Sequence, residues 1–328
     1  MPELPDLTIY IEALHRRVTG RRLERIRLAS PFFLRTVDPP LGDAHGRMVC
    51  ELRRIGKRIV FGLEGKLFLV VHLMVTGRFH WRQAGAKIPQ KVGLAAFDFA
   101  HGTLMLTEAA TTKLAALHLV CGEHGLRQFD LGGIEPLTAD VQSFRTALTR
   151  ENYTVKRALT EPRLFSGIGN AYSDEILHRA RVSPVERTVG LTDDNITRLF
   201  EATRTVLSEW IDRLRIETGD RFPEKVTAFH ENMAVHGRYG RTCPVCRSPV
   251  QRIVYAKNET NYCPTCQTGG KLLADRALSR LLKSDRPKSL QELDGLRAKH
   301  RQSNDQERGW NLNVLMTASN RIDSFNEA

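Results

Sequence analysis

The chain has 328 residues, 41% of them apolar, which is enough for two packed domains or for two domains and a small module. No apolar run approaches the ~20 residues that a membrane-spanning helix needs, and the opening MPELPDLTIY lacks the basic and apolar parts of a secretory signal. Lysine and arginine number 49 against 37 acidic residues, a net charge of +12 that favours polyanionic partners. We therefore expect an intracellular protein of the cytoplasm or nucleoid without membrane contact. On charge alone, a basic protein with no nucleic-acid role remains an alternative.

The first half of the chain is predicted to form one helix followed by strands. Leu7, Tyr10, Ile11 and Leu14 recur at helical spacing before Gly20 ends the pattern. Short segments rich in β-branched and apolar residues follow, separated by glycines, and they indicate a sandwich or a barrel. The predicted strands are 23–30, 47–55, 57–65, 66–74, 77–82, 93–100 and 102–108.

The second half is predicted to be helical, and the change of character falls between residues 125 and 137. The clearest helix carries apolar residues on one face from Ile196 to Leu214. Before it, helices are expected at 138–150 and 155–162, and a glycine-rich turn leads into another helix within 166–184. A helix at 272–283 and a flexible polar tail from about residue 284 complete the chain.

Four of the six cysteines form two close pairs near the C-terminal end. Cys243 and Cys246 are separated by two residues, as are Cys263 and Cys266, and the segment between the pairs alternates like a β-hairpin. Zinc prefers four soft ligands in a tetrahedron, and each pair supplies two thiolates, so we expect one structural Zn²⁺ in a β-hairpin zinc finger. The alternative is four unrelated cysteines. Cys50 and Cys121 lie among apolar residues and are expected to be core thiols (Cys50 in MVCEL, Cys121 in LVCGE).

Three motifs in this order resemble one protein family. They are Met1-Pro2-Glu3-Leu4-Pro5-Asp6, Gly167-Ile168-Gly169-Asn170-Ala171-Tyr172, and the paired cysteines. Together they resemble the formamidopyrimidine-DNA glycosylase and endonuclease VIII family over roughly residues 2 to 270, and the opening is more similar to the formamidopyrimidine branch. The resemblance implies an α+β multidomain fold with an N-terminal helix and β-sandwich, a helical helix–two-turn–helix domain and the zinc finger.

The resemblance also implies that Pro2, Glu3 and Lys57 are catalytic. Removal of Met1 would expose Pro2 as a secondary amine, and an α-amino group with a pKa near ~8 is partly unprotonated at neutral pH. Such an amine adding to the sugar C1′ gives an iminium, an electron sink that expels the damaged base and promotes elimination of the strand phosphates. Glu3 can serve as a general acid at the ring oxygen. Lys57 matches the family's lysine at a strand turn, and an exposed lysine that contacts only phosphate is its alternative.

The segment from Val155 to Pro184 resembles the family's helix–two-turn–helix, which grips DNA. Glycines let the backbone approach a phosphate at the start of the next helix, where N–H groups are free. The resemblance implies DNA contacts by Lys156, Asn170 and Tyr172, and it implies a structural, orienting role for Glu175. In the finger, Asn258 stands where the family usually has an arginine, and Lys257 is expected to replace that charge in part.

Both loops that fill the space of the extruded base in the family also differ here. Val75 stands at the methionine position, beside Met74, and the segment 108–113 lacks the arginine and the phenylalanine of the second loop. Base extrusion from intact duplex costs a few kcal/mol, which these side chains help to offset. We therefore expect a substrate that is open, single-stranded, crosslinked or distorted.

The predicted enzyme is a bifunctional DNA glycosylase and AP lyase of base-excision repair that acts as a monomer on damaged or abasic DNA. Its predicted parts are a catalytic β-sandwich domain at 1–130, a DNA-binding helical domain at 137–232, the zinc finger at 236–270 and the tail at 284–328. The alternative is a non-catalytic protein that recognises damaged or branched DNA on the same fold. A metal-dependent nuclease is a weaker alternative, because the cysteines account for the zinc.

Overall fold

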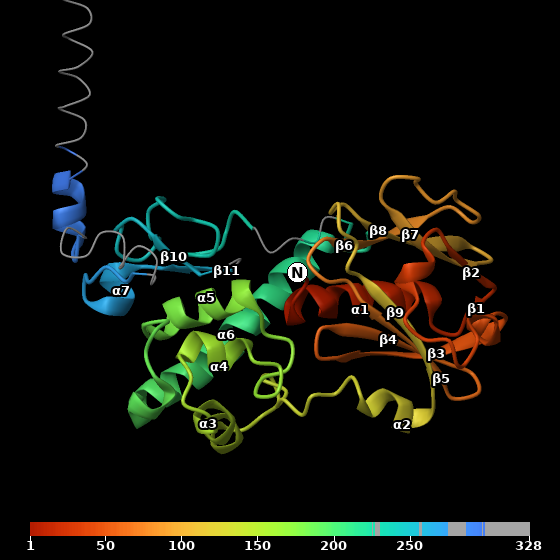
Figure 1. Ribbon diagram of the computed structural model, residues 1–328, viewed down its shortest axis with the longest axis horizontal. Coiled ribbons are helices and arrows are strands. Elements are labelled where there is room, and N and C mark those ends of the chain that lie inside the picture. The colour runs from red at the N-terminus through yellow and green to blue at the C-terminus, as the bar shows by residue number, and fades with distance from the viewer. Residues whose placement is uncertain (225, 227–229, 256–257, 275–286, 297, 299–328) are drawn as a thin grey trace, which may run out of the picture.

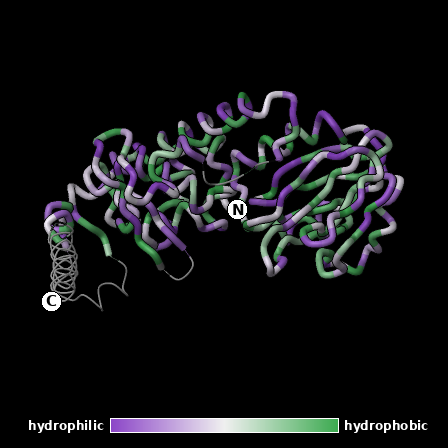
Figure 2. The backbone as a smooth tube through the Cα atoms, turned by 90° about the horizontal axis from the view of Figure 1, so that it is seen from above, coloured by the Kyte–Doolittle hydropathy of each residue, from purple (hydrophilic) through white to green (hydrophobic). Residues whose placement is uncertain are grey.

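The protein consists of two lobes, and the N-terminus lies between them (Figures 1 and 2). The computed structural model describes residues 1–224, 226, 230–255, 258–274, 287–296 and 298. Strands form most of the first lobe, while helices and a two-stranded ribbon form the second (Figure 1). This α+β arrangement confirms the predicted fold class.

The first lobe is a sandwich of two antiparallel sheets with helix α1 (Leu4–Val18) against it. The five-stranded sheet has the order β1-β3-β4-β5-β9, and the four-stranded sheet has the order β2-β7-β8-β6. Its strands are β1 (Arg22–Leu23), β2 (Arg25–Leu28), β3 (Arg47–Ile55), β4 (Arg58–Leu63), β5 (Leu67–His72), β6 (Gly77–Arg82), β7 (Gly93–Phe99), β8 (Gly102–Glu108) and β9 (Ala116–Cys121). The sandwich resolves the predicted choice between sandwich and barrel. Strand β9 was not among the segments predicted individually.

The core of the sandwich is apolar and aromatic. The rings of Phe61 and Phe97 stack with centroids 6.2 Å apart, and Phe79 meets both rings edge-on. Tyr10 of α1 packs against Phe79 and is fully buried. Burial of aromatic side chains contributes strongly to stability. The helix that begins at the N-terminus is therefore fixed to the sandwich along its length.

The second lobe contains the predicted helices, with caps that the sequence specifies. Asp140 caps α3 (Val141–Thr149), Thr154 caps α4 (Val155–Thr160), and Thr192 caps α6 (Asp193–Thr218); each side chain accepts a backbone N–H of the first turn. Helix α5 (Asn170–Ala180) follows the glycine-rich turn and ends at Arg181 in a left-handed conformation. Short helical segments also occur elsewhere in the chain up to α6. They are the 3₁₀ turns η1 (Pro31–Phe33) and η2 (Leu41–Ala44) between β2 and β3, helix α2 (Gly122–Arg127) after β9, and the 3₁₀ turn η3 (Thr188–Gly190) before α6.

The ribbon beside α5 is the predicted hairpin, formed by β10 (Gln251–Tyr255) and β11 (Asn258–Tyr262) and followed by α7 (Pro264–Thr268). Most of the helix predicted at 272–283 lies outside the described residues. In the predicted tail, residues 287–296 and 298 are described, and there Ser289 pairs with Lys271 before a helical turn. Among all described residues, no helix is long and apolar enough to cross a bilayer.

The prediction that Cys50 and Cys121 are core thiols is wrong, because both are exposed. Val49 points into the core and a bulge follows it, so Cys50 faces outward beside Glu51. Cys121 is the last residue of β9 and the cap of α2. Apolar neighbours in sequence therefore did not place either thiol in the core.

Candidate active site and nucleic-acid interface

The Glu3 carboxylate is fixed at the N-terminal end of α5. It is 2% exposed, and it accepts hydrogen bonds from the backbone N–H groups of Gly169 (2.7 Å), Ala171 (2.9 Å) and Tyr172 (3.2 Å). A helix N-terminus presents free N–H donors and partial positive charge, which stabilise an anion. The first lobe's N-terminal residues are therefore held by the second lobe.

Two glycines make this close approach possible. Gly167 has a φ of +81°, accepts the N–H of Leu4 at 2.9 Å, and has the Leu4 Cβ 2.9 Å from where its own Cβ would lie. A Cβ on Gly169 would lie 2.5 Å from Glu3 Oε1 and 2.7 Å from Lys57 Nζ. The motif Gly-Ile-Gly thus leaves room for the predicted catalytic residues rather than only for a DNA phosphate.

Lys57 lies at the turn between β3 and β4, and its amine points to the same place. Burial lowers the pKa of Lys57, and the nearby Glu3 carboxylate opposes that shift. Burial likewise lowers the pKa of the amine of Met1, the residue before Pro2. The structure thus brings Lys57 and the Met1 amine close to Glu3, next to Pro2 in the chain, and burial makes both amines easier to deprotonate.

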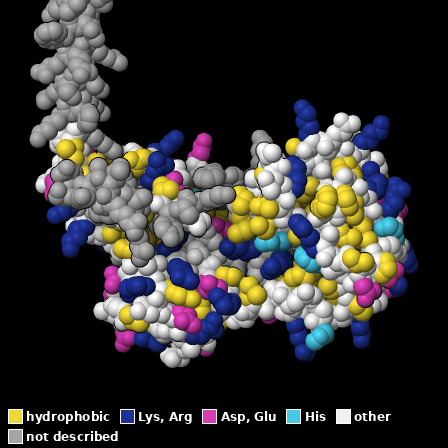
Figure 3. Space-filling view, in the orientation of Figure 1, with side chains coloured by type: hydrophobic (Ala, Val, Ile, Leu, Met, Phe, Trp, Pro, Cys, Tyr) yellow, Lys and Arg dark blue, Asp and Glu magenta, His cyan; other side chains and the backbone are white. Residues whose placement is uncertain are grey.

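A cavity of about 300 Å³ opens beside these residues, lined by Met1, Lys57, Arg58, His72, Phe129 and Gly167 among others. Burial, followed by the charges of Arg58 and Lys57, lowers the pKa of His72 to about 4, so the imidazole is neutral at physiological pH. The cavity wall therefore carries the basic side chains of Lys57 and Arg58, with the acidic Asp130 also in its lining. Figure 3 shows Lys and Arg side chains on both lobes of the face that it views.

On the other side of the N-terminal segment, Asp6 lines a cavity of about 480 Å³ between α1 and α6, together with Glu217 and His230. Asp6 is buried and accepts the N–H of Glu3 at 2.8 Å. Burial raises the pKa of Asp6 to about 7. No role was predicted for Asp6, although its spacing from Glu3 is that of a capping pair, which could have indicated one.

A second residue without a predicted role joins the lobes beside Lys57. Arg54 of β3 donates to Ser166 Oγ at 3.0 Å and to the Gly56 carbonyl at 2.6 Å, and it pairs with Glu135. It thereby ties the β3–β4 turn to the segment before α5. Its neighbours in sequence are also basic, so charge alone could not single it out.

Four of the five predicted DNA-contact residues are described, and they divide into three groups. Asn170 is partly exposed, and its Nδ2 donates to the Glu259 carbonyl at 2.8 Å; Asn258 is exposed at the start of β11. The Lys156 ammonium is already bound, to the Asn170 carbonyl and to Asp174, both at 2.6 Å. Tyr172 is fully buried with its hydroxyl inside the protein, which does not agree with a side-chain contact to DNA. Lys257 lies outside the described residues.

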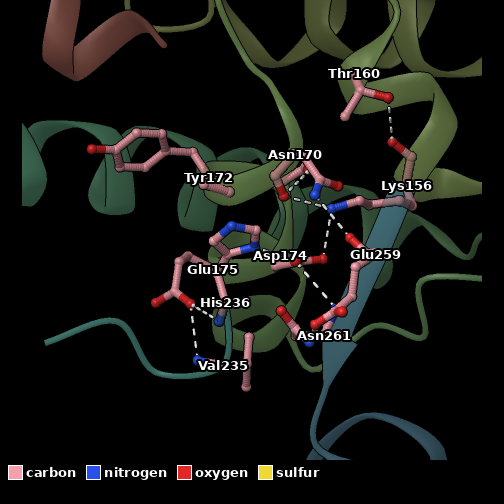
Figure 4. Close-up of polar contacts among 12 residues, drawn as sticks. Lys156, Thr160, Asn170, Tyr172, Asp174, Glu175, Val235, His236, Glu259 and Asn261 are labelled. Atoms are coloured by element: carbon pink, nitrogen blue, oxygen red, sulfur yellow. Dashed lines mark hydrogen bonds and ion pairs between the residues drawn. The ribbon is translucent and has the colours of Figure 1, made fainter. Parts of the chain in front are cut away.

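Glu175 has the orienting role that the resemblance implied. Its carboxylate accepts the N–H groups of Ala234 (2.7 Å), Val235 (2.9 Å) and His236 (3.0 Å), just before the ribbon. Burial raises the pKa of Glu175, and these three donors oppose the shift. The side chain therefore fixes the path of the chain into the ribbon (Figure 4).

The four cysteine thiols form one compact cluster. Their sulfur atoms all lie within 4.8 Å of one another, which fits a single tetrahedral zinc. His178 of α5 reaches the cluster, with Nε2 3.3 Å from Cys243 Sγ. Hydrogen bonds to ligand sulfur are typical of the surroundings of a structural metal. The chain thus has the four ligands of one structural zinc, and α5 contacts one of these ligands through His178.

The two loops at the positions that fill the space of the extruded base in the family, here called the wedge loops, differ from each other. Val75 is 55% exposed and follows Met74, which has a φ of +54°. The second loop folds back on Glu108, a buried carboxylate that accepts the N–H groups of Leu114 and Ala115. Leu114 is 49% exposed. The loops therefore expose one valine and one leucine at the surface.

Comparison with family models defines the class of protein. Residues 1–113 match the formamidopyrimidine-DNA glycosylase N-terminal domain, residues 133–220 match its H2TH domain, and residues 240–269 match the zinc finger found in FPG and IleRS. These three modules in this order define a DNA glycosylase with a zinc finger.

Similarity to formamidopyrimidine-DNA glycosylases extends over most of the chain. Formamidopyrimidine-DNA glycosylase of Heliobacterium modesticaldum is 34% identical over 280 residues, covering 81% of this chain and 100% of the relative. That of Thermus thermophilus is 33% identical, with 82% and 100% covered. The chain therefore belongs to the formamidopyrimidine-DNA glycosylase family. An uncharacterized formamidopyrimidine-DNA glycosylase-like protein of Mycobacterium tuberculosis is 40% identical over 46% of this chain and 94% of its own length.

Solved structures agree with this assignment. A complex between the Lactococcus lactis Fpg and DNA containing an abasic site is similar, with a TM-score of 0.72 and 25% identity, and the match covers 81% of this chain and 99% of that one. A structure of MutM with DNA containing carbocyclic 8-oxo-G has the same TM-score and identity.

Proposed function

We propose that this chain is a base-excision DNA glycosylase with AP lyase activity, in which the Pro2 amine attacks C1′ of a damaged nucleotide. The observation that carries the proposal is the convergence of the N-terminal segment, Glu3 and Lys57 at Gly169. Groups held in reacting geometry raise reaction rates strongly, because the entropic cost of bringing them together is met in folding. Removal of Met1 makes Pro2 the terminal amine.

The proposed first step forms a C1′–N bond to Pro2 and breaks the bond between C1′ and the damaged base. The surroundings that lower the pKa of the Met1 amine would act on the Pro2 amine too, and would increase its unprotonated fraction at neutral pH. Because proline is a secondary amine, the product with the opened sugar is a cationic iminium. The Pro2 nitrogen loses its N–H proton as the bond forms; the Glu3 carboxylate would accept that proton and pass it to the ring oxygen as the ring opens.

The proposed second step is elimination. The iminium makes the C2′ hydrogen acidic; its removal pushes electrons towards C3′ and expels the 3′ phosphate. Lys57, whose pKa is lowered by burial, would accept the C2′ proton in its neutral form. Water then releases the sugar fragment and regenerates the Pro2 amine.

The proposed substrate is damaged or abasic DNA that is already open, single-stranded or distorted. The support is that the two wedge loops expose Val75 and Leu114 and lack the methionine, the arginine and the phenylalanine that stand in the loops of the family. Extrusion of a base from intact duplex costs a few kcal/mol, and these loops contribute little to meeting it.

The test is trapping of the iminium. Protein from which loss of Met1 is confirmed by mass spectrometry is incubated with abasic-site DNA and sodium borohydride, beside a Pro2→Gly variant. We expect a covalent protein–DNA adduct that maps to residue 2 and that is much reduced in the variant. Absence of an adduct from wild-type protein that binds the same DNA would overturn the proposal and support the recognition-only alternative.

A further inference from the structure

One fully buried carboxylate, that of Asp174, joins three separate segments of the second lobe. It accepts hydrogen bonds from Lys156 Nζ of α4 (2.6 Å), from His236 Nδ1 before the ribbon (2.8 Å), and from the Asn261 N–H of β11 (3.2 Å). Figure 4 shows the three donors arranged around this carboxylate. A buried charge is tolerated when partners surround it, and its loss leaves those partners unpaired.

The network continues to the surface through Lys156 and Asn170. The Lys156 ammonium also donates to the Asn170 carbonyl at 2.6 Å, and Asn170 Nδ2 donates to the Glu259 carbonyl of β11 at 2.8 Å. The first turn of α5 and the ribbon are thus linked twice, once directly and once through Asp174. This is the same turn whose N–H groups hold Glu3.

The contacts to the ribbon follow one face of α5. Asn170, Asp174 and His178 are spaced four residues apart, so their side chains lie above one another on the helix. Asn170 contacts β11, Asp174 contacts β11 and His236, and His178 contacts Cys243. The zinc finger, which includes the ribbon, therefore packs on this face of α5.

We propose that Asp174 is a positioning residue for DNA binding, a role that rests on the proposed function above. It holds the start of α5 and the zinc ribbon in one arrangement, so that Asn170 and Asn258 contact the same DNA backbone together. Lys156 serves this network: its charge is matched by Asp174 instead of being offered to a phosphate.

Electrostatics and positioning predict opposite results for Asp174→Asn. The substitution makes the protein more positive by one charge, and a gain in positive charge by itself strengthens binding to a polyanion. Loss of the buried carboxylate, in contrast, leaves Lys156 without its ionic partner and loosens the ribbon from α5. Weaker binding by a more positive protein would therefore be a signature of positioning.

The experiment measures the Kd for duplex DNA containing a tetrahydrofuran abasic analogue by fluorescence anisotropy over a series of salt concentrations. Asp174→Asn is compared with Asp212→Asn, which makes the same charge change at an exposed residue of α6 paired with Arg215. We expect at least tenfold weaker binding for Asp174→Asn, and unchanged or slightly tighter binding for Asp212→Asn. Binding by Asp174→Asn as tight as the wild type, or tighter, would overturn the proposal.

A second variant decides the matter if Asp174→Asn loses zinc or unfolds. Lys156→Gln removes the charge but keeps an N–H donor. A lysine that contacts a phosphate contributes about one unit to the slope of log Kd against log salt concentration. If Lys156 contacts DNA directly, its substitution should therefore lower this slope by about one. We expect weaker binding with an unchanged slope, and a fall in slope by about one would overturn the proposal.

Borohydride trapping at saturating DNA separates this proposal from the proposed function. A positioning role predicts that Asp174→Asn raises the DNA concentration needed for half-maximal trapping and leaves the maximal rate near that of the wild type. A lower maximal rate with an unchanged half-maximal concentration would contradict it. If the wild type forms no adduct, the proposed function fails, and the anisotropy comparison still decides the role of Asp174.

Discussion

The Lys57 amine and the Glu3 carboxylate meet at the backbone of Gly169, which has no side chain to keep them apart. A Cβ at this position would lie 2.7 Å from Lys57 Nζ and 2.5 Å from Glu3 Oε1. Both atoms are closer than a carbon can approach without displacement. The third residue of the Gly-Ile-Gly motif is thus part of the candidate active site.

Gly169→Ala should therefore reduce the rate of iminium trapping by roughly 100-fold, because a displacement of about 1 Å can cost that much. The matched control is Gly42→Ala, since a Cβ at Gly42 meets no atom within 4 Å. Single-turnover trapping with abasic DNA measures both variants. Equal rates for Gly169→Ala and the wild type would show that the two side chains do not act together.

The buried Asp6 should make the stability of the fold depend on pH. Its pKa is raised by burial from 3.8 to about 7, so between about pH 4 and pH 7 the folded chain holds a proton that the unfolded chain has lost. The free energy of unfolding therefore falls as pH rises through this window, by up to about 1.4 kcal/mol per unit, and the stabilisation is absent above it.

Asp6→Asn can still accept the Glu3 N–H but does not titrate. We expect a flatter dependence of stability on pH in the variant, and higher stability than the wild type at pH 8. Urea unfolding from pH 4.5 to pH 8 measures the difference. Parallel curves for the two proteins would mean that Asp6 remains ionised in the folded state.

The side chains of the wedge loops predict a preference for unpaired DNA. Cleavage of a lesion in a single strand or a bubble should exceed cleavage in matched duplex by about tenfold or more, since extrusion from duplex costs a few kcal/mol. Val75→Met, which enlarges an exposed side chain, should lower the ratio of cleavage in unpaired DNA to cleavage in matched duplex. Equal cleavage of paired and unpaired substrates by the wild type would contradict this prediction.

The exposed Asn258 offers a gain-of-function test. Arginine is a charged, bidentate phosphate ligand, and asparagine is not. Asn258→Arg should tighten DNA binding about fivefold at low salt. It should also steepen the slope of log Kd against log salt concentration by about 0.9, the value for one added phosphate contact on duplex DNA. Anisotropy titrations at several salt concentrations measure both quantities. Tighter binding with no change in slope would indicate a contact other than phosphate.

The sequence could predict the parts of this site that consist of local motifs. The cysteine spacing identified the zinc ligands. A cap identified α3, the stop at Pro162 identified α4, and the apolar face identified α6. The opening motif identified Glu3, which the structure places against the start of α5, 166 residues away in the chain. Its assignment came from resemblance, since no local pattern predicts a contact over that distance.

Other parts depend on tertiary packing. Lys156 is basic and precedes the glycine turn, which favoured a phosphate contact, but the buried Asp174 beside it takes up its charge. Tyr172 lies in the motif, yet helix α5 turns its ring into the core against Trp210. A motif gives the order of residues along a helix, while the neighbouring elements decide which of them reach the surface.

Helix α1 belongs to both hydrophobic cores: Leu7, Tyr10 and Leu14 pack in the sandwich, whereas Leu4 and Ile9 pack with the helical lobe. Pro2, the proposed nucleophile, lies just before this shared helix. Its position therefore depends on both lobes. Halves produced separately by cutting the chain near residue 131 would each expose an apolar stripe. An affinity tag fused ahead of Pro2 would leave such a protein folded and able to bind DNA, but without its reactive amine.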